Sequence, residues 1–106
     1  MSYDEGLLAR CLDVLRTGKV GAVRHKNVFG MRGLLRNHTM FAAVGEAGMI
    51  VKLLPAEYDR ALTRPGVTPF APGGQKLGTW VELPFEEVAD DPELREWLEA
   101  ALRTIR

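Results

Sequence analysis

Between residues 20 and 53 the sequence consists of short apolar runs separated by turn residues, and this pattern limits the fold more than any other feature. The runs GLLR, MFAAV and MIVKL alternate with the segments NHT and GEAG. Such runs carry no helical period, and the segments between them have hairpin length. Asn37 and residues 46–48 tolerate the positive φ angles of tight turns. The sequence therefore predicts a three-stranded antiparallel meander, preceded by an extended segment over 19–29 that can form a strand of its own.

A helix is expected before the meander. Ser2 and Glu5 have the spacing of a capping box, and the leucines that follow share one helical face with Cys11. Gly18 ends this helix. Cys11 is therefore expected in the core, where a small buried hydrophobe fits.

The second half of the chain predicts two further helices and two further strands. Pro55 suits the first turn of a short helix that ends before TRPG, VTPF predicts a brief edge strand, and LGTWVELP predicts a fifth strand. Asp91 and Pro92 begin a final helix with a continuous apolar stripe. The expected fold is thus a two-layer α+β domain over residues 1–106, ordered helix, three strands, helix, two strands, helix, with a mainly antiparallel sheet.

The composition is that of one soluble domain. The chain has 106 residues, of which 46% are hydrophobic and 26% are charged, enough for one core without disulfides. A single cysteine cannot form an internal disulfide, which favours a reducing compartment. No basic leader precedes a long apolar run, and no run approaches the roughly 18 apolar residues of a membrane span. We therefore expect a cytoplasmic protein that does not enter a membrane.

The residue types offer little for catalysis. Ser2 is the only serine, and the only cysteine is expected in the core. His25 and His38 have no acidic partner or second ligand nearby in the sequence, and the acids over 82–99 lack the spacing of a calcium loop. We expect no catalytic residues, no metal site and no cofactor, and hence no enzyme.

The stretch VFGMRGLLRN combines glycines with basic residues. It matches neither the dinucleotide fingerprint nor a phosphate loop, because both of these require a helix where a strand is expected here. Phe29, Gly30 and Gly33 are therefore interpreted as a structural turn that leads onto the sheet, with Phe29 anchored in the core. Arg32, held between two glycines, is expected at an exposed corner where an acidic partner can reach it.

Opposite charges are segregated along the chain although the net charge is zero. Six basic residues and no acid lie between Arg16 and Arg36, whereas eight acids and a single base lie between Glu82 and Glu99. A dipolar surface would steer charged partners. We favour the alternative that the two segments neutralise each other, within the fold or across a dimer.

The order of the motifs resembles a known family. Nearly the whole chain resembles the N-terminal domain of the TfoX (Sxy) competence regulators. The resemblance lies in three stretches that follow one another in this order: VFGMRGLLRNHTMFAAVGEAGMIVKL, TPFAPGGQKLGTWVELP and DDPELREWLEAAL. The shared positions are Phe29, Gly30, Phe41, Ala42, Lys52, Pro69, Phe70, Trp80, Pro84 and Trp97. Val28 stands where the family usually has Met, and a tryptophan strand replaces a tyrosine-bearing one, as in the related YjbR-like proteins.

The resemblance carries its own implications. It implies the YjbR-like α+β fold and an association with the regulation of competence genes, and it implies no catalytic residues. Full TfoX proteins carry a second, C-terminal domain, which these 106 residues do not include, so a role that depends on that domain does not transfer.

The first functional hypothesis is a regulatory or adaptor module that binds another protein. Strand alternation places Trp80, Ile50 and Lys52 on the sheet face away from the helices, and an exposed Trp and Ile beside a Lys would form an interaction patch. Arg32 is added as a candidate partner contact. In the alternative, the loop APGGQK folds over Trp80.

Two other functions remain open at this point. Arg24, Lys26 and Arg36 are candidate contacts to phosphates or to an acidic partner, and together with Arg32 they would serve nucleic-acid binding. A small ligand could instead bind between the sheet and the APGGQK loop. A homodimer is compatible with all of these.

Overall fold

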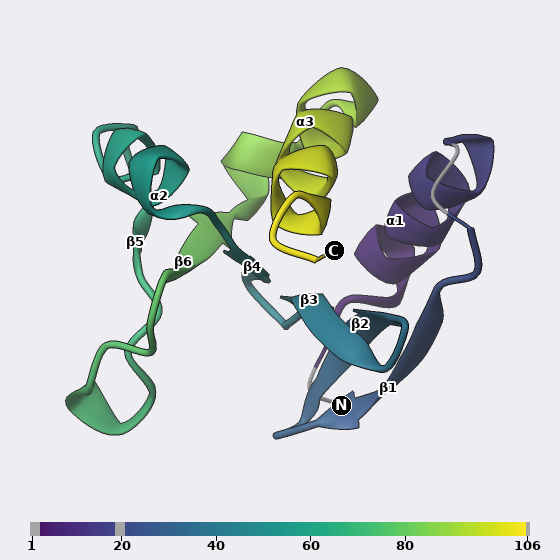
Figure 1. Ribbon diagram of the computed structural model, residues 1–106, viewed down its shortest axis with the longest axis horizontal. Helices are drawn as coiled ribbons and strands as arrows, with labels where there is room; N and C mark the ends of the chain where they lie inside the picture. Colours follow the sequence, from purple (N-terminus) through teal and green to yellow (C-terminus); the bar gives the residue numbers. More distant parts are fainter. Residues whose placement is uncertain (1–2, 19–20, 106) are drawn as a thin grey trace.

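A computed structural model describes residues 3–18 and 21–105. Within this part of the chain, three α-helices cover one face of a six-stranded antiparallel sheet (Figure 1). The helices are α1 (Glu5–Thr17), α2 (Pro55–Ala61) and α3 (Asp91–Leu102). The strands are β1 (Arg24–Val28), β2 (Met31–Arg36), β3 (Thr39–Val44), β4 (Gly48–Lys52), β5 (Thr68–Pro69) and β6 (Trp80–Pro84), in the spatial order β1-β2-β3-β4-β6-β5. The expected two-layer α+β architecture is confirmed.

The segment before the meander forms a strand of its own, so the first sheet unit has four strands rather than three. β1 pairs antiparallel with β2 and lies at the edge of the sheet. Four of its five residues are exposed. An edge strand with polar side chains on both faces has no apolar alternation, which is why the sequence pattern left this segment undecided.

The elements after the meander follow the expected order. Pro55 occupies the first turn of α2. β5 pairs with β6 and is the other edge strand of the sheet. An edge strand tolerates Pro69, which has no N–H to donate to a second neighbouring strand. Short 3₁₀ turns at Pro72–Gly74 and Phe85–Val88 flank β6. β6 lies between β4 and β5 and pairs with both.

Two helix starts differ from the expected ones. The N-cap of α1 is Asp4, whose carboxylate accepts a hydrogen bond of 2.8 Å from the Leu7 amide. The capping box assigned to Ser2 is thus not the cap of α1, and Ser2 lies outside the described residues. α3 has Asp90 as its N-cap, one residue earlier than expected, with Pro92 still in the first turn. In each case an aspartate one or two residues from the expected start takes the N-cap position.

The turn over residues 29–33 also differs in part. Phe29 and Gly30 form a two-residue turn between Val28 and Met31, which pair with each other. The expectation that Phe29 anchors in the core is wrong, because its side chain is 98% exposed. Gly33 lies within β2 and takes no part in a turn.

The core lies between the helices and the inner face of the sheet. Val51 and Leu83 from the sheet pack with Leu98 of α3 and Cys11 of α1 in one buried cluster, and α1 packs against α3. A register shift opposite Leu35 lets Phe41 join this core. The helices therefore cover the centre of one face of the sheet, whereas His25 and Asn27, on the same face of the edge strand β1, are exposed.

Candidate functional site

The sheet face opposite the helices carries three of the predicted site residues. Val51 of β4 and Val81 of β6 lie in the core, so their strand neighbours point to the opposite face, here called the outer face. Ile50, Lys52 and Trp80 therefore share this face, as the alternation predicted. Lys52 is directly opposite Trp80 in the β4–β6 register.

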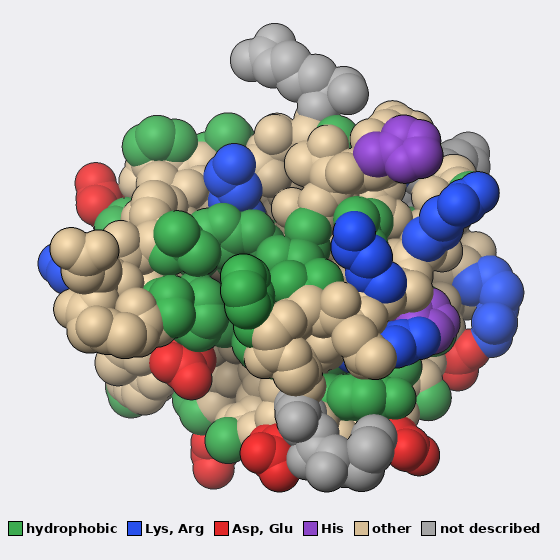
Figure 2. All heavy atoms as spheres, turned by 90° about the horizontal axis from the view of Figure 1, so that it is seen from below, with side chains coloured by type: hydrophobic (Ala, Val, Ile, Leu, Met, Phe, Trp, Pro, Cys, Tyr) green, Lys and Arg blue, Asp and Glu red, His purple; other side chains and the backbone are tan. Residues whose placement is uncertain are grey.

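The outer face contains an apolar hollow of about 320 Å³. Figure 2 shows this face, with hydrophobic side chains gathered at its centre and Lys and Arg side chains mainly to one side. We call the hollow the outer groove. The outer groove is lined by Val28, Phe29, Met31, Met40, Ala43, Ile50, Phe70, Pro72, Leu77 and Trp80.

The floor of the outer groove is built from small side chains. Gly33 is directly opposite Ala43 in the register, and Ala43 is directly opposite Ile50. A Cβ on Gly33 would lie 2.7 Å from the Met40 sulfur and 3.0 Å from a Val28 methyl. Gly33 thus keeps the floor low by having no side chain.

Ile50 is less accessible than the sequence implied. It points outward but is only 3% exposed, because it lies deep in the outer groove. Trp80 is half-buried. The expected exposed patch of Trp and Ile is wrong for Ile50, and the apolar surface accessible to a partner consists of other side chains around it.

One wall of the outer groove is the loop between β5 and β6. The Phe70 amide donates to the Trp80 carbonyl at 3.0 Å, and the Leu77 amide donates to the Phe70 carbonyl at 3.0 Å. These bonds hold Pro72 and Leu77 beside the indole. The alternative in which APGGQK covers Trp80 is therefore confirmed in part, because the loop forms a wall and leaves the hollow open.

The opposite wall is the tip of the β1–β2 hairpin. Phe29 has φ of 52° and Gly30 has φ of 78°, the arrangement of a type I′ turn, which favours Asn-Gly. A bulky residue rarely adopts positive φ, and this conformation is less stable by about 1–2 kcal/mol. Phe29 thus holds an unfavourable backbone conformation while its ring gains no burial within the domain.

The charged side chains of the outer face are mostly basic. Lys26 is opposite Gly33 in the register, and Arg24 lies two residues before it on the same strand. Both therefore share the outer face with Lys52, while Glu82 is the acidic side chain that β6 places there.

Arg32 does not belong to this surface. It is opposite Val44, a core residue, so it points to the helix side of the sheet. Its guanidinium donates to His25 Nδ1 and to Asn27 Oδ1, both at 2.8 Å, and lies 6.0 Å from the Tyr3 ring centroid. The predicted exposed corner is wrong, since strand alternation turns Arg32 away from Trp80 and local contacts occupy it.

Arg36 is also set apart from the other basic candidates. It is the last residue of β2, opposite Thr39 and next to the Asn37–His38 turn. The basic residues that the sequence grouped over 24–36 therefore lie on two faces and at one end of the sheet, and they do not form a single stripe.

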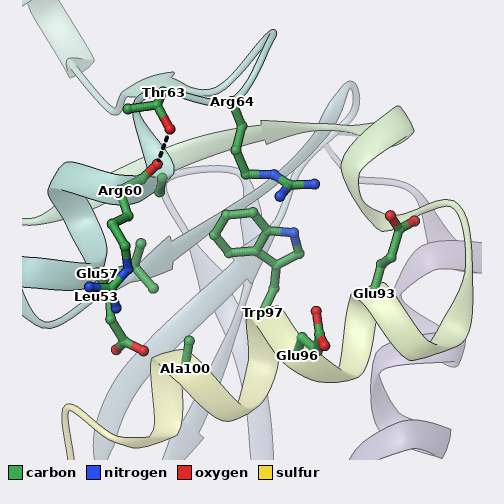
Figure 3. A pocket seen from close by; sticks show the side chains of 10 residues that line it. Leu53, Glu57, Arg60, Thr63, Arg64, Glu93, Glu96, Trp97 and Ala100 are labelled. Atoms are coloured by element: carbon green, nitrogen blue, oxygen red, sulfur yellow. Dashed lines mark hydrogen bonds between the residues drawn. The ribbon is translucent and has the colours of Figure 1, made fainter.

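A second hollow, of about 350 Å³, lies between α2 and α3 (Figure 3). Trp97 lies in it, with the Arg64 guanidinium 5.8 Å from the indole centroid, and Arg64 Nε donates to Glu87 at 2.7 Å. Glu57 pairs with Arg103, and this hydrogen bond raises the pKa of Arg103. The Arg64 and Glu57 side chains of this hollow are thus held in ion pairs, whereas Glu57 Oε1 is buried without a hydrogen-bond partner among the described residues.

The four ion pairs among the described residues leave the charge segregation in place. They join Arg10 to Asp91, Arg16 to Asp13, Arg64 to Glu87 and Arg103 to Glu57. None connects the basic segment 16–36 with the acidic segment 82–99. The expected neutralisation within the fold is therefore not observed among the described residues.

Cys11 is fully buried in the core, as expected. Burial raises the pKa of its thiol to about 12, against a smaller opposing effect of Arg10. Because the thiolate is the nucleophilic form, this group is chemically inert at neutral pH. Within residues 3–18 and 21–105, no three His, Cys, Asp or Glu side chains cluster to hold a metal ion, and no helix is long and apolar enough to cross a membrane.

The fold and the outer groove together define a small α+β domain with helices on one sheet face and an open apolar hollow on the other. The sequence model of the TfoX N-terminal domain matches residues 16–105. The chain belongs to the TfoX N-terminal domain family, which at family level identifies a regulatory module of the competence type. No curated protein and no solved structure matches the chain.

Proposed function

We propose that this domain is a small non-enzymatic regulatory or adaptor module of the cytoplasm that acts by binding a partner protein in the outer groove. The observation that carries the proposal is Phe29, an aromatic side chain that is 98% exposed at the edge of an apolar hollow. Transcription or competence regulation is the setting that the family supports.

The backbone at Phe29 supports a binding role for its side chain. Strained residues persist where function retains them, and an exposed aromatic that costs stability is such a residue. Aromatic side chains dominate the binding energy of protein interfaces when a partner buries them. Phe29 and Trp80 face the same hollow from opposite walls, so one partner segment would bury both.

The lining favours a protein over a small molecule. Small-ligand sites combine an apolar pocket with a few convergent polar groups that fix the orientation of the ligand. All ten side chains that line the outer groove are hydrophobic. Such a surface gains affinity through apolar burial, as the central part of a protein interface does.

The arrangement of basic residues also bears on nucleic-acid binding. Backbone-tracking proteins align cations along one groove. Here Arg24 and Lys26 are on the outer face, while Arg32 is on the helix side and bonded to His25. The same residues serve an acidic partner segment better than a continuous phosphate chain.

The test is capture of partners on the immobilised domain from an extract of the source cells, with identification by mass spectrometry. Phe29→Asn and Trp80→Ala alter the outer groove, and Arg60→Ala on α2 is the control because it is exposed on the helix side. Circular dichroism verifies that each variant is folded. We expect proteins that the wild type and Arg60→Ala retain and that both groove variants lose. Equal retention by all four domains would refute the proposal.

A further inference from the structure

We infer that the occupant of the outer groove is a short acidic segment of a partner protein, with bulky apolar side chains in the hollow and carboxylates directed toward β1. This inference rests on the proposed function and adds the chemistry of the partner. It follows from the order of side chains across the outer face.

One register row crosses the whole groove. Lys26 is opposite Gly33, Gly33 is opposite Ala43, Ala43 is opposite Ile50, and Ile50 is opposite Glu82. The row therefore begins with a cation on the β1 side, passes over a low apolar floor and ends with an anion on the β6 side. An occupant that crosses this row meets positive charge at one end and apolar surface in the middle.

The neighbouring positions strengthen the positive end. Arg24 is on the same strand face as Lys26, and Lys52 lies opposite Trp80 at the border of the hollow. None of these three cations belongs to the four ion pairs of the described residues. Their charges are available to a partner, which would gain mainly in association rate and specificity.

The size of the hollow limits what enters it. About 320 Å³ is at the lower end of the roughly 300–1,000 Å³ of ligand pockets. This space takes one or two anchor side chains of a segment. Phe29, 98% exposed at the edge of the hollow, would be buried by the seated segment.

A second copy of the chain fits this face less well. Arg24, Lys26 and Lys52 outnumber Glu82 on the outer face, so a two-fold dimer through this face would place net positive charge against itself. A partner with acidic residues removes that repulsion.

The experiment is selection of a random peptide library displayed on phage against the full chain, with counter-selection on Phe29→Asn. We expect enriched peptides that combine aromatic or aliphatic residues with a clear excess of Asp and Glu over Lys and Arg. Enrichment of apolar peptides with neutral or basic composition would overturn the acidic inference while leaving the groove as a docking site. No enrichment over the counter-selection would overturn the proposed function as well.

Three measurements on the enriched peptides complete the test. Lys26→Glu should weaken binding roughly ten-fold, as expected for loss of a cation at a complementary interface, whereas Arg60→Glu on the helix side should leave it unchanged. Added salt should weaken binding to the wild type more than binding to Lys26→Glu, which keeps only Arg24 and Lys52. An equal effect of the two charge reversals contradicts the inference.

Two other outcomes would assign the outer face to a different occupant. Competition by a single-stranded oligonucleotide at lower concentration than the peptide would assign it to nucleic acid. Sedimentation of the free domain as a dimer that Phe29→Asn disrupts would assign it to a second copy.

Discussion

The two hairpin turns at the ends of β2 share a backbone geometry and differ in chemistry. Phe29 and Gly30 have φ of 52° and 78°, and Asn37 and His38 have φ of 51° and 66°. Asn is among the residues that tolerate this conformation best, because its short polar side chain bonds locally. Phe has no such property. The chain thus uses a suitable residue in the turn remote from the outer groove and an unsuitable one in the turn that borders it.

The difference indicates that the two turns were selected for different reasons. The Asn37–His38 turn closes a hairpin and needs only to be stable. The Phe29–Gly30 turn presents an exposed ring beside an apolar hollow, and it retains that ring at the expense of turn stability.

The largest expected effect is on partner affinity. Phe29→Asn should reduce the binding free energy of a groove-binding peptide by about 2 kcal/mol, which lowers its affinity roughly 30-fold and is typical of an interface hot spot. Isothermal titration calorimetry measures this change. Asn37→Ala, at the other turn, should bind as the wild type does, and equal weakening of the two variants would contradict the distinction between the turns.

A smaller effect is expected when the aromatic residue is placed in the other turn. Asn37→Phe should lower the free energy of unfolding by about 1 kcal/mol, because Phe replaces a residue that tolerates positive φ. Urea denaturation followed by circular dichroism measures the loss. Unchanged stability would show that a phenylalanine is acceptable in this turn geometry.

The floor of the outer groove offers a third comparison. Gly33→Ala places a methyl group 2.7 Å from the flexible end of Met40, so Met40 must shift. We expect a few-fold loss of peptide affinity, with a change in unfolding free energy of about 0.5 kcal/mol or less. Unchanged affinity would show that the hollow is not the place where the partner anchors.

The smallest effect is expected at Cys11, where no substitution is needed. Labelling of its thiol tests whether the core of the folded domain excludes solvent. Burial raises the folded pKa of Cys11 from the ordinary thiol value of 9.0 to about 12, so stability from the neutral thiol is complete below pH 9 and is lost as pH rises toward 12. A thiol reagent at pH 8 should label Cys11 only at the rate of unfolding. Rapid labelling of the folded domain would contradict the closed core.

The sequence predicted the fold well because its signals are local. The apolar stripes of α1 and α3, the turn residue Asn37 and the helix start at Pro55 each depend on neighbours in the chain. Strand alternation also placed Trp80 and Lys52 on the outer face correctly.

The candidate site was predicted less well because its residues depart from the usual preferences of their residue types for burial and for turns. Phe29 was expected in the core because large aromatic residues are usually buried. The turn was predicted, but it was extended to Gly33 because Phe-Gly lacks the Asn-Gly signature of a two-residue turn. Arg32 was assigned to the wrong face because Gly33 was taken for a turn residue rather than a strand residue. A phenylalanine before a glycine between two strands was the available signal.

The stability of Phe29→Asn tests the central claim most directly, because it requires no partner. If Phe29 is retained for binding, Asn in its place relieves the unfavourable φ and loses no buried contact. The free energy of unfolding should then rise by about 1 kcal/mol. A loss of stability would show that Phe29 supports the fold, and would contradict the account.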